Sequence, residues 1–485
     1  MIFKTKGFVH TDKSAYYISE TSFNLDKDLS SLKFEFFGGG KELFFHVKDP
    51  SGLLRVQHQS STEPSTVLLH EDETKSAIGT CPGKIRKGDW RINVFTYAPR
   101  FNRMWGEVSF EVKVLEGKDD YDSRPENYVS WIKSDEMEKG NILLNCFEPE
   151  NIDLLDETWL SGDFHVHSML SDGSSTPLEL LDEGLSKNLD FFFITEHNIL
   201  TTGFPQKKGI TVFPSYEVTT AIGHFNACGL RYVPEGFLPK GPAPSWNALE
   251  KLIKDFREKG VFVSINHPFM VPWQWQYNDL PLSWIDSVEV ISDPYDKNSV
   301  DANEKAMTLI DILWNNGFRI TGIGGSDTHT RFSASKLGQP VTKVYAKPGS
   351  LSSMLEGVKK HRVEIFVDLN CNFNYMSKGK VLLPGTDIGS SEDIPLEFSL
   401  SLDREPDPVS LRVIENGKIV EEKKVFSGEK CVIERVWKGN SGWIRCEIRD
   451  GNNRIRGYIN PLHRGEQKRT IETWGDALDL LNSRF

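Results

Sequence analysis

The first part of the chain contains short runs in which apolar and polar residues alternate, separated by glycine, proline and aspartate. Residues 33–37 and 90–95 are two such runs. Because successive side chains of a strand point to opposite faces, this alternation is typical of antiparallel sheets with one face on a core. A charged, turn-rich stretch at residues 116–122 then indicates a connection between domains. We therefore predict an N-terminal β-sandwich over residues 1–117 and a linker over residues 118–157.

In the middle of the chain, residues 158–363, helical periodicity alternates with buried apolar runs. Thr176 has the features of a helix N-cap, with apolar residues following at helical spacing. Buried strands are predicted at residues 191–195 and 261–265, each after a helix, and a third helix and strand cover residues 301–323. Such repeated units imply parallel strands with right-handed crossovers. This α/β pattern is compatible with a barrel or with a doubly wound sheet.

Alternating runs return in the last part of the chain. Two of them lead into the turn sequences Asn416-Gly417 and Asp450-Gly451, which are strong hairpin signals because these residues tolerate positive φ. Residues 364–465 are therefore predicted to form a second β-sandwich. Residues 466–485 place Trp474 and two leucines on one helical face, so we expect a short docked C-terminal helix.

Composition narrows the class of partner. The 485 residues include 57 Lys and Arg against 69 Asp and Glu, a net charge of −12, which argues against a protein that grips nucleic-acid polymers through their phosphates. A small-molecule substrate fits better. No apolar segment approaches the length that spans a bilayer, so we expect no membrane association and a cytoplasmic location. The six scattered cysteines form no close pair and are expected to be free thiols.

Potential metal ligands occur where predicted strands meet loops. In His165-Val166-His167 the period-two spacing sends both imidazoles to the same side of a strand. A lone histidine at a strand end is more often a structural residue, but nine candidate ligands at successive strand ends favour a metal centre. The candidates are His165, His167, Asp172, His197, Glu217, His224, His267, Asp327 and His329.

These motifs resemble those of the polymerase and histidinol phosphatase (PHP) superfamily. The resemblance is specific between about residues 159 and 344, and the flanking β regions make the chain similar to the CehA/McbA-type metallohydrolases. It implies a distorted (β/α)7 barrel with a centre of two or three metal ions. The residues that carry the resemblance are His165-x-His167, Ser171-Asp172-Gly173, Thr195-Glu196-His197-Asn198, Glu217, Gly223-His224, Asn266-His267-Pro268 and Gly325-Ser326-Asp327-x-His329.

The resemblance also implies which residues share an ion. One ion would be held by His165, His167, Glu217 and Asp327; Glu217 would bridge to a second, held by His224 and His267; Asp172, His197 and His329 would hold a third. Glu196 stands where many relatives have Asp, a change that concerns the orientation of the next histidine more than metal binding. Imidazole and carboxylate ligands without thiolate favour manganese, zinc or iron, and the sequence does not choose among them.

This centre predicts a metal-dependent hydrolase. Paired divalent ions polarise a substrate oxygen and lower the pKa of a water toward about 7, so no serine nucleophile is needed. The leading prediction is a phosphoesterase that uses metal-activated hydroxide on small phosphate mono- or diesters, with Glu217, Asp327 and His267 as catalytic residues. Two alternatives stay open: hydrolysis of a carboxylic or carbamate ester, and a non-catalytic scaffold that binds glycans or a partner.

Three residues next to the motifs are candidates for substrate contacts. Trp273 belongs to an aromatic run after His267 that would form a substrate wall, although such runs are more often hydrophobic plugs. Arg331 has the planar fork that binds phosphate, although isolated arginines are usually solvated. Asn198 directly follows His197. The sequence does not indicate an oligomeric state.

Overall fold

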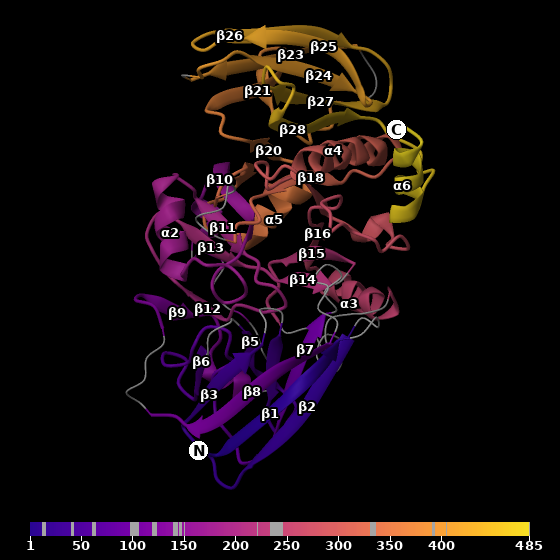
Figure 1. The fold of residues 1–485 in the computed structure, drawn as a ribbon. Coiled ribbons are helices and arrows are strands. Elements are labelled where there is room, and N and C mark those ends of the chain that lie inside the picture. Colours follow the sequence, from indigo (N-terminus) through magenta and orange to yellow (C-terminus); the bar gives the residue numbers. More distant parts are fainter. Residues whose placement is uncertain are drawn as a thin grey trace.

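The computed structural model describes most of the chain. It describes residues 1–485 except 12–15, 40–42, 61–64, 98–105, 119–123, 139–143, 145–147, 150, 221, 233–245, 330–335, 390–392, 404 and 485. The fold is mixed α/β, dominated by sheets with few helices. Figure 1 shows the N-terminal sheets at one end of an elongated molecule, the C-terminal sheets at the other end and the remaining elements between them.

Two four-stranded antiparallel sheets enclose the N-terminal hydrophobic core. Strand β3 shows the predicted alternation, with Phe34 and Phe36 buried, and Trp90 lies fully buried in the same core. One sheet has the order β1 (Phe3–Thr11), β8 (Gly106–Glu116), β3 (Ser31–Gly38) and β6 (Ser65–His70). The other has the order β2 (Tyr16–Leu25), β7 (Gly88–Tyr97), β4 (Phe44–Lys48) and β5 (Leu54–Gln59).

The central strands fall into two sheets. In the first, β10 (Thr158–Val166), β11 (Phe191–Ile194) and β13 (Thr211–Pro214) run parallel; β19 (Val341–Ala346) pairs antiparallel with β10, and β20 (Val363–Phe366) pairs antiparallel with β19. The second has the order β14 (Glu217–Thr220), β15 (Gly223–Cys228), β16 (Phe262–Ile265), β17 (Ser287–Ser292) and β18 (Thr321–Gly325). Isolated parallel bridges, Val166 with Thr328 and His197 with Glu217, join the two sheets.

The three helices predicted for this region are present. Thr176 caps the first, as predicted, through a capping box with Glu179, and Pro177 occupies its first turn. The strands do not follow a plain strand–helix repeat, however, because β14, β15 and β16 pair antiparallel. The helices that accompany these strands in the described part of the chain are α2 (Pro177–Ser186), α3 (Trp246–Glu258), α4 (Ser299–Asn315) and α5 (Leu351–Lys359).

At the C-terminal end two layers enclose a second β core, but one layer continues the central sheet. Strand β20 pairs with β28 (Ile455–Arg464), which extends the first central sheet through β27 (Gly442–Arg449) and β24 (Val409–Glu415) to β25 (Lys418–Val425). The facing layer contains β22 (Lys380–Leu382), β21 (Cys371–Ser377), β23 (Ile394–Leu402) and β26 (Lys430–Trp437). The predicted domain boundaries stay a prediction, since this shared sheet crosses one of them.

Short elements complete the chain. The predicted C-terminal helix is α6 (Trp474–Asn482), with Trp474 fully buried. The linker region contains β9 (Tyr128–Ser130), which pairs with β12 (Gly203–Pro205), and α1 (Ser134–Glu138). Single 3₁₀ turns lie at Ile152–Leu154 and Leu282–Trp284.

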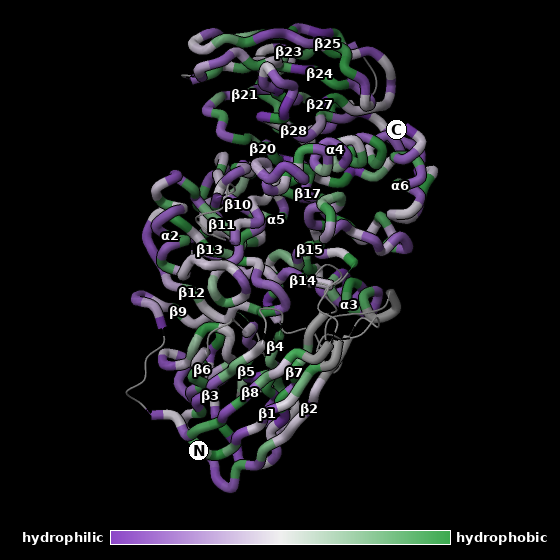
Figure 2. The backbone as a smooth tube through the Cα atoms, viewed as in Figure 1, coloured by the Kyte–Doolittle hydropathy of each residue, from purple (hydrophilic) through white to green (hydrophobic). Residues whose placement is uncertain are grey.

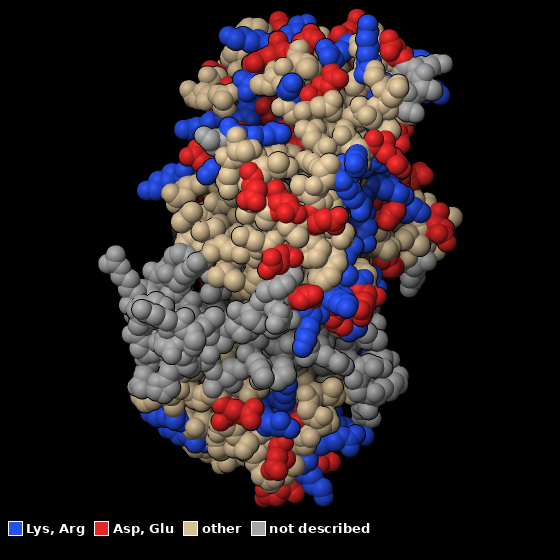
Figure 3. Space-filling view, turned by 90° about the vertical axis from the view of Figure 1, so that its right-hand side faces the viewer, with Lys and Arg blue, Asp and Glu red and all other residues tan. Residues whose placement is uncertain are grey.

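Charged side chains lie on the outside of the sheets. Figure 2 shows a largely hydrophilic β25 on the outside of the C-terminal sheets, where lysines and glutamates protect an edge strand from pairing with another chain. On the face drawn in Figure 3, basic and acidic side chains are interspersed.

Five cysteines are free and buried, as predicted, whereas Cys146 lies outside the described residues. Among the described residues, no helix has the length and apolar character needed to cross a bilayer.

Candidate metal centre

All nine predicted ligands converge at one edge of the central strands. Their ligand atoms form four overlapping groups, and within each group the atoms lie within 4.8 Å of one another. The groups are His165, His167 and Asp327; His165, Glu217 and His267; His197, Glu217 and His224; and His167, Asp172, His197 and His329. The prediction that these distant residues meet in space is therefore confirmed; that they hold metal stays a prediction.

The strand directions explain this convergence. His165 and His167 lie at the end of β10, His197 follows β11, His267 follows β16, and Asp327 follows β18, so parallel strands deliver them to one edge. His224 departs from the expectation that the ligands end their strands. Its strand β15 runs antiparallel to β16, so a residue at the start of β15 reaches the same edge.

Glu217 lies at the centre of the histidines. Its Oε1 is 3.3 Å from His165 Nε2, 3.3 Å from His224 Nδ1 and 3.7 Å from His267 Nε2. Its Oε2 is 2.5 Å from His197 Nδ1 and 3.6 Å from His167 Nε2. One carboxylate therefore faces five imidazoles.

Asp327 faces the first histidine pair from the other side. Its Oδ1 lies 3.3 Å from His165 Nε2 and 3.2 Å from His167 Nε2. Asp172 Oδ1 lies 3.3 Å from His329 Nε2 and 3.5 Å from His197 Nε2. The side chains of His329 and Asp172 are 33% and 27% exposed, whereas His165, His167 and Glu217 are fully buried. The group around Asp172 thus lies toward solvent, and the group around Glu217 lies deeper.

Unsatisfied polar atoms show that these residues fit a metal site. A buried polar atom without a partner costs about 1–3 kcal/mol, so such atoms are rare unless something else binds them. Among the described residues this edge gathers several that have no hydrogen-bond partner: His165 Nε2, both ring nitrogens of His167, Asp172 Oδ1, His224 Nδ1, His267 Nδ1 and Asp327 Oδ1. Imidazole nitrogens and carboxylate oxygens of this kind are suited to divalent cations.

The charges of the site favour ionised carboxylates. Burial alone would raise the pKa of Glu217, but His197, His165 and His224 outweigh it and hold that pKa well below its usual value. The pKa of Asp327 is likewise held well below its usual value, because His165 and His329 outweigh its burial. Burial and the neighbouring histidines lower the pKa of His167 to about 3. The neutral ring of His167 and the ionised carboxylates are in protonation states that bind metal, whereas neighbouring carboxylates outweigh burial and raise the pKa of His165, His197 and His329.

Two buried carboxylates that support the centre were missed by the sequence reasoning. Glu289 Oε1 lies 2.7 Å from His165 Nδ1, and its Oε2 accepts a hydrogen bond of 2.8 Å from the backbone N–H of His267. Asp163 accepts hydrogen bonds from the backbone N–H groups of His165 and Ser326, both at 3.0 Å. A glutamate between two valines, in the segment 287–292, was the available signal for Glu289.

Glu196 supports a ligand loop. It accepts hydrogen bonds from the hydroxyl groups of Ser168 and Ser171 and, at 3.1 Å, from the backbone N–H of Ser168. These contacts hold the segment that leads to Asp172. The ring of His197 is oriented by other groups, since its Nδ1 lies 2.6 Å from Thr219 Oγ1 as well as next to Glu217.

The three candidates for substrate contacts have different surroundings. Asn198 is fully buried, and both atoms of its amide bond to the backbone of Thr219, so this geometry assigns it to holding β14. Trp273 is 45% exposed, whereas Trp275 in the same aromatic run is buried and packs against Phe225. The run is therefore partly a hydrophobic plug. Arg331 lies outside the described residues.

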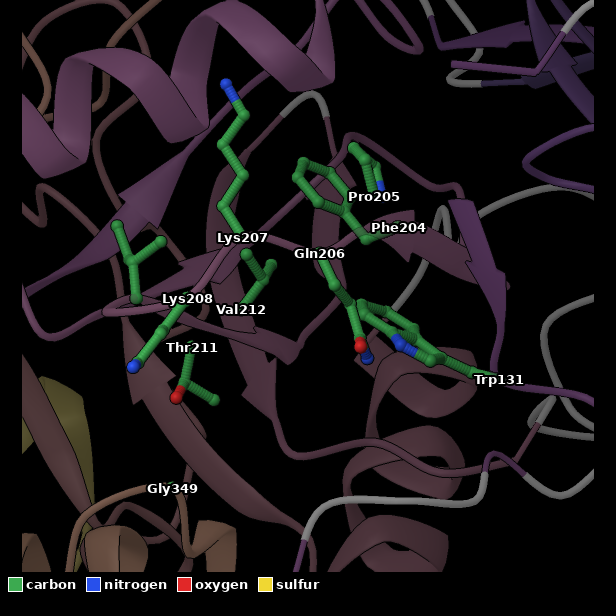
Figure 4. A pocket seen from close by; sticks show the side chains of 10 residues that line it. Trp131, Phe204, Pro205, Gln206, Lys207, Lys208, Thr211, Val212 and Gly349 are labelled. Carbon is green, nitrogen blue, oxygen red and sulfur yellow. The ribbon is translucent and has the colours of Figure 1, made fainter. Parts of the chain in front are cut away.

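A separate pocket lies away from the nine ligands. It has a volume of about 350 Å³ and is lined by Trp131, Phe204, Gln206 and Lys208 among others (Figure 4). Thr211, also in its lining, begins β13, at the opposite end of that strand from Glu217. None of the residues that line it belongs to the candidate metal centre.

Comparison with known proteins leaves the family open. No family model and no curated protein matches the chain. A two-domain protein containing a predicted PHP-like metal-dependent phosphoesterase, from Bacteroides vulgatus, is similar at 18% identity over 66% of this chain and 98% of that chain, with a TM-score of 0.37. A β-glucosidase from Kluyveromyces marxianus is 9% identical over 93% of this chain and 46% of that chain, with a TM-score of 0.15. Similarities this low establish no function, which is therefore argued from the site.

Proposed function

We propose that the protein is a metal-dependent hydrolase of the PHP superfamily, of the CehA/McbA type, that cleaves small phosphate mono- or diesters. The observation that carries this proposal is the convergence of six histidines and three carboxylates around buried atoms that lack hydrogen-bond partners. The bridges that join the two central sheets at Val166 and at His197 support a distorted (β/α)7 barrel as the underlying arrangement.

Two or three divalent ions, manganese, zinc or iron, would be held by these residues. When bound, such ions lower the pKa of a water toward about 7 and neutralise charge that develops on the substrate. Glu217 would bridge two of these ions, because it faces five imidazoles. Asp327 and His267 complete the deeper part, and the more exposed Asp172 and His329 lie where a small-molecule substrate would enter.

A second candidate is hydrolysis of a carboxylic or carbamate ester at the same centre. Among the described residues, Asp172, Glu217 and Asp327 form ion pairs with histidines, and no lysine or arginine pairs with them. A phosphate dianion is usually bound with help from such cations, whereas a neutral ester does not need them. This observation supports the ester hydrolase as the second candidate. The non-catalytic scaffold ranks third.

A substrate panel separates these functions. Purified protein loaded with manganese, zinc or iron is assayed with aryl phosphate monoesters, phosphate diesters and aryl carboxylic esters, beside the variants His165→Ala and Asp327→Asn. We expect turnover of phosphate esters by the wild type and its loss in both variants, with Asp301→Asn, an exposed aspartate on α4, as the matched control. Turnover of carboxylic esters alone would support the second candidate. A protein that takes up no metal from excess manganese and zinc would support the scaffold.

A further inference from the structure

Asp293 occupies a position that the metal centre does not use. Strand β17 lies between β16 and β18, and all three run parallel. His267 follows β16 and Asp327 follows β18, while Asp293 directly follows β17. Parallel strands end at the same edge of a sheet. Asp293 therefore follows the middle strand at the edge where the two neighbouring strands are followed by residues of the centre.

The backbone at Asp293 repeats an unusual conformation of those neighbours. Its φ is 38°, compared with 27° at His267 and 50° at Asp327. A non-glycine residue with positive φ is uncommon and strained, and such residues cluster at functional sites. The backbone N–H of Asp293 also donates to the carbonyl of Gly325, at 3.3 Å, which fixes Asp293 beside the end of β18.

One oxygen of the Asp293 side chain has no hydrogen-bond partner among the described residues. This atom, Oδ1, is buried, while the carboxyl group accepts a hydrogen bond from the backbone of Asp296 and interacts electrostatically with Asp327, Asp296 and His329. Burial, together with the Asp327 carboxylate, raises the pKa of Asp293 to about 7. Yet Asp293 belongs to none of the four groups of clustered ligand atoms. It therefore lies next to the centre without being part of it.

We propose that the Asp293 carboxyl group donates a proton to the leaving oxygen of the substrate; this role rests on the proposed hydrolase function. As water oxygen bonds to phosphorus, the bond to the leaving oxygen breaks and its electron pair stays on that oxygen. The oxygen takes the proton of Asp293 and departs as an alcohol. The attacking water releases a proton, the Asp293 carboxylate regains one from solvent, and the net reaction consumes one water per ester.

A series of leaving groups tests this role. Asp293→Asn keeps the size of the side chain but removes its acidic proton, and Asp301→Asn is the matched control. General acid catalysis contributes about 10²–10⁴-fold, and poor leaving groups depend on it most. We expect Asp293→Asn to lower kcat/KM by about 100-fold or more for alkyl esters and by less than about threefold for nitrophenyl esters. Metal content per chain is measured in parallel and is expected to equal that of the wild type.

Three results would overturn the proposal: an equal loss for alkyl and nitrophenyl esters, no loss for either, or a loss of bound metal in Asp293→Asn, which would make Asp293 a ligand. The same series is run on phosphate and carboxylic esters. A wild type that cleaves only carboxylic esters contradicts the proposed phosphoesterase, while the leaving-group comparison still decides the role of Asp293 on those esters. A wild type that cleaves neither contradicts both.

Discussion

Glu289 shows how a single buried carboxylate can orient the centre. It contacts the ring of His165 through one oxygen and the backbone of His267 through the other. Because His165 Nδ1–H donates to Glu289, its Nε2 is left directed toward Glu217 and Asp327. Such contacts fix the tautomer and the ring angle of a histidine ligand, so they affect metal affinity without touching the metal.

Glu289→Gln is expected to weaken metal binding by about 10–100-fold. The amide is uncharged, and only one of its two polar atoms can accept a hydrogen bond, so it cannot make both contacts. The measurement is competition for zinc or manganese against a chelator of known affinity. Glu364→Gln, at another buried glutamate in a strand, is the matched control and should bind metal as the wild type does. Equal affinities for Glu289→Gln and the wild type would show that His165 is oriented without Glu289.

At the scale of elements, the sequence predicted those features of helices and strands that depend on neighbouring residues in the chain. The cap of α2 at Thr176 and the alternation of β3 follow from local residue preferences, and both are present. Strand β17 and Glu289 were missed although Ser287 to Val290 alternate between polar and apolar residues; all six residues of the strand are buried, so this alternation does not mark one solvent-facing side. The direction of β15, and hence the route by which His224 reaches the site, depends on pairing between distant segments.

Strand β20 carries a charge-sensitive position. Burial raises the pKa of Glu364 from 4.5 to about 8, against a smaller opposing effect of Lys343. Between pH 4.5 and about pH 8 the Glu364 carboxyl keeps its proton in the folded state and loses it in the unfolded state. Its contribution to the free energy of unfolding is therefore full below about pH 4.5 and declines as the pH rises toward 8. Glu364→Gln removes this dependence.

We therefore expect the stability of Glu364→Gln relative to the wild type to increase by about 1.4 kcal/mol for each unit by which the pH exceeds the pKa of the carboxyl in the unfolded state. Urea unfolding at pH 5, 6.5 and 8 measures the difference in the free energy of unfolding. The exposed Glu421→Gln is the control and should differ from the wild type by a constant amount. A difference between Glu364→Gln and the wild type that does not grow with pH would contradict the assigned burial of Glu364.

At the scale of the whole molecule, the N-terminal sheets contact the segment that leaves the metal centre. Gln57 on β5 accepts a 3.0 Å hydrogen bond from the Leu200 N–H and donates one of 3.3 Å to the Leu200 carbonyl. Leu200 lies three residues after His197. Neither this contact nor the sheet shared with the C-terminal strands was predictable, since no local pattern encodes a partner 143 residues away.

Gln57→Ala removes both hydrogen bonds and leaves buried backbone groups of Leu200 unpaired, which costs about 1–3 kcal/mol. Local opening of the segment should then increase, and the Leu200 amide should exchange with deuterium about tenfold faster or more. Hydrogen exchange followed by mass spectrometry measures this. Gln206→Ala, at an exposed glutamine in the same part of the chain, should leave the exchange unchanged. Unchanged exchange in Gln57→Ala would mean that the N-terminal sheets do not hold this segment.

The central claim is that one edge of the central strands forms a single multinuclear metal centre. A crystal structure of the protein loaded with manganese or zinc, with anomalous diffraction recorded at the absorption edge of the metal, tests it most directly. We predict two or three anomalous peaks among the nine side chains, with one pair of ions bridged by Glu217. The absence of peaks there, with the metal in excess, would contradict the account.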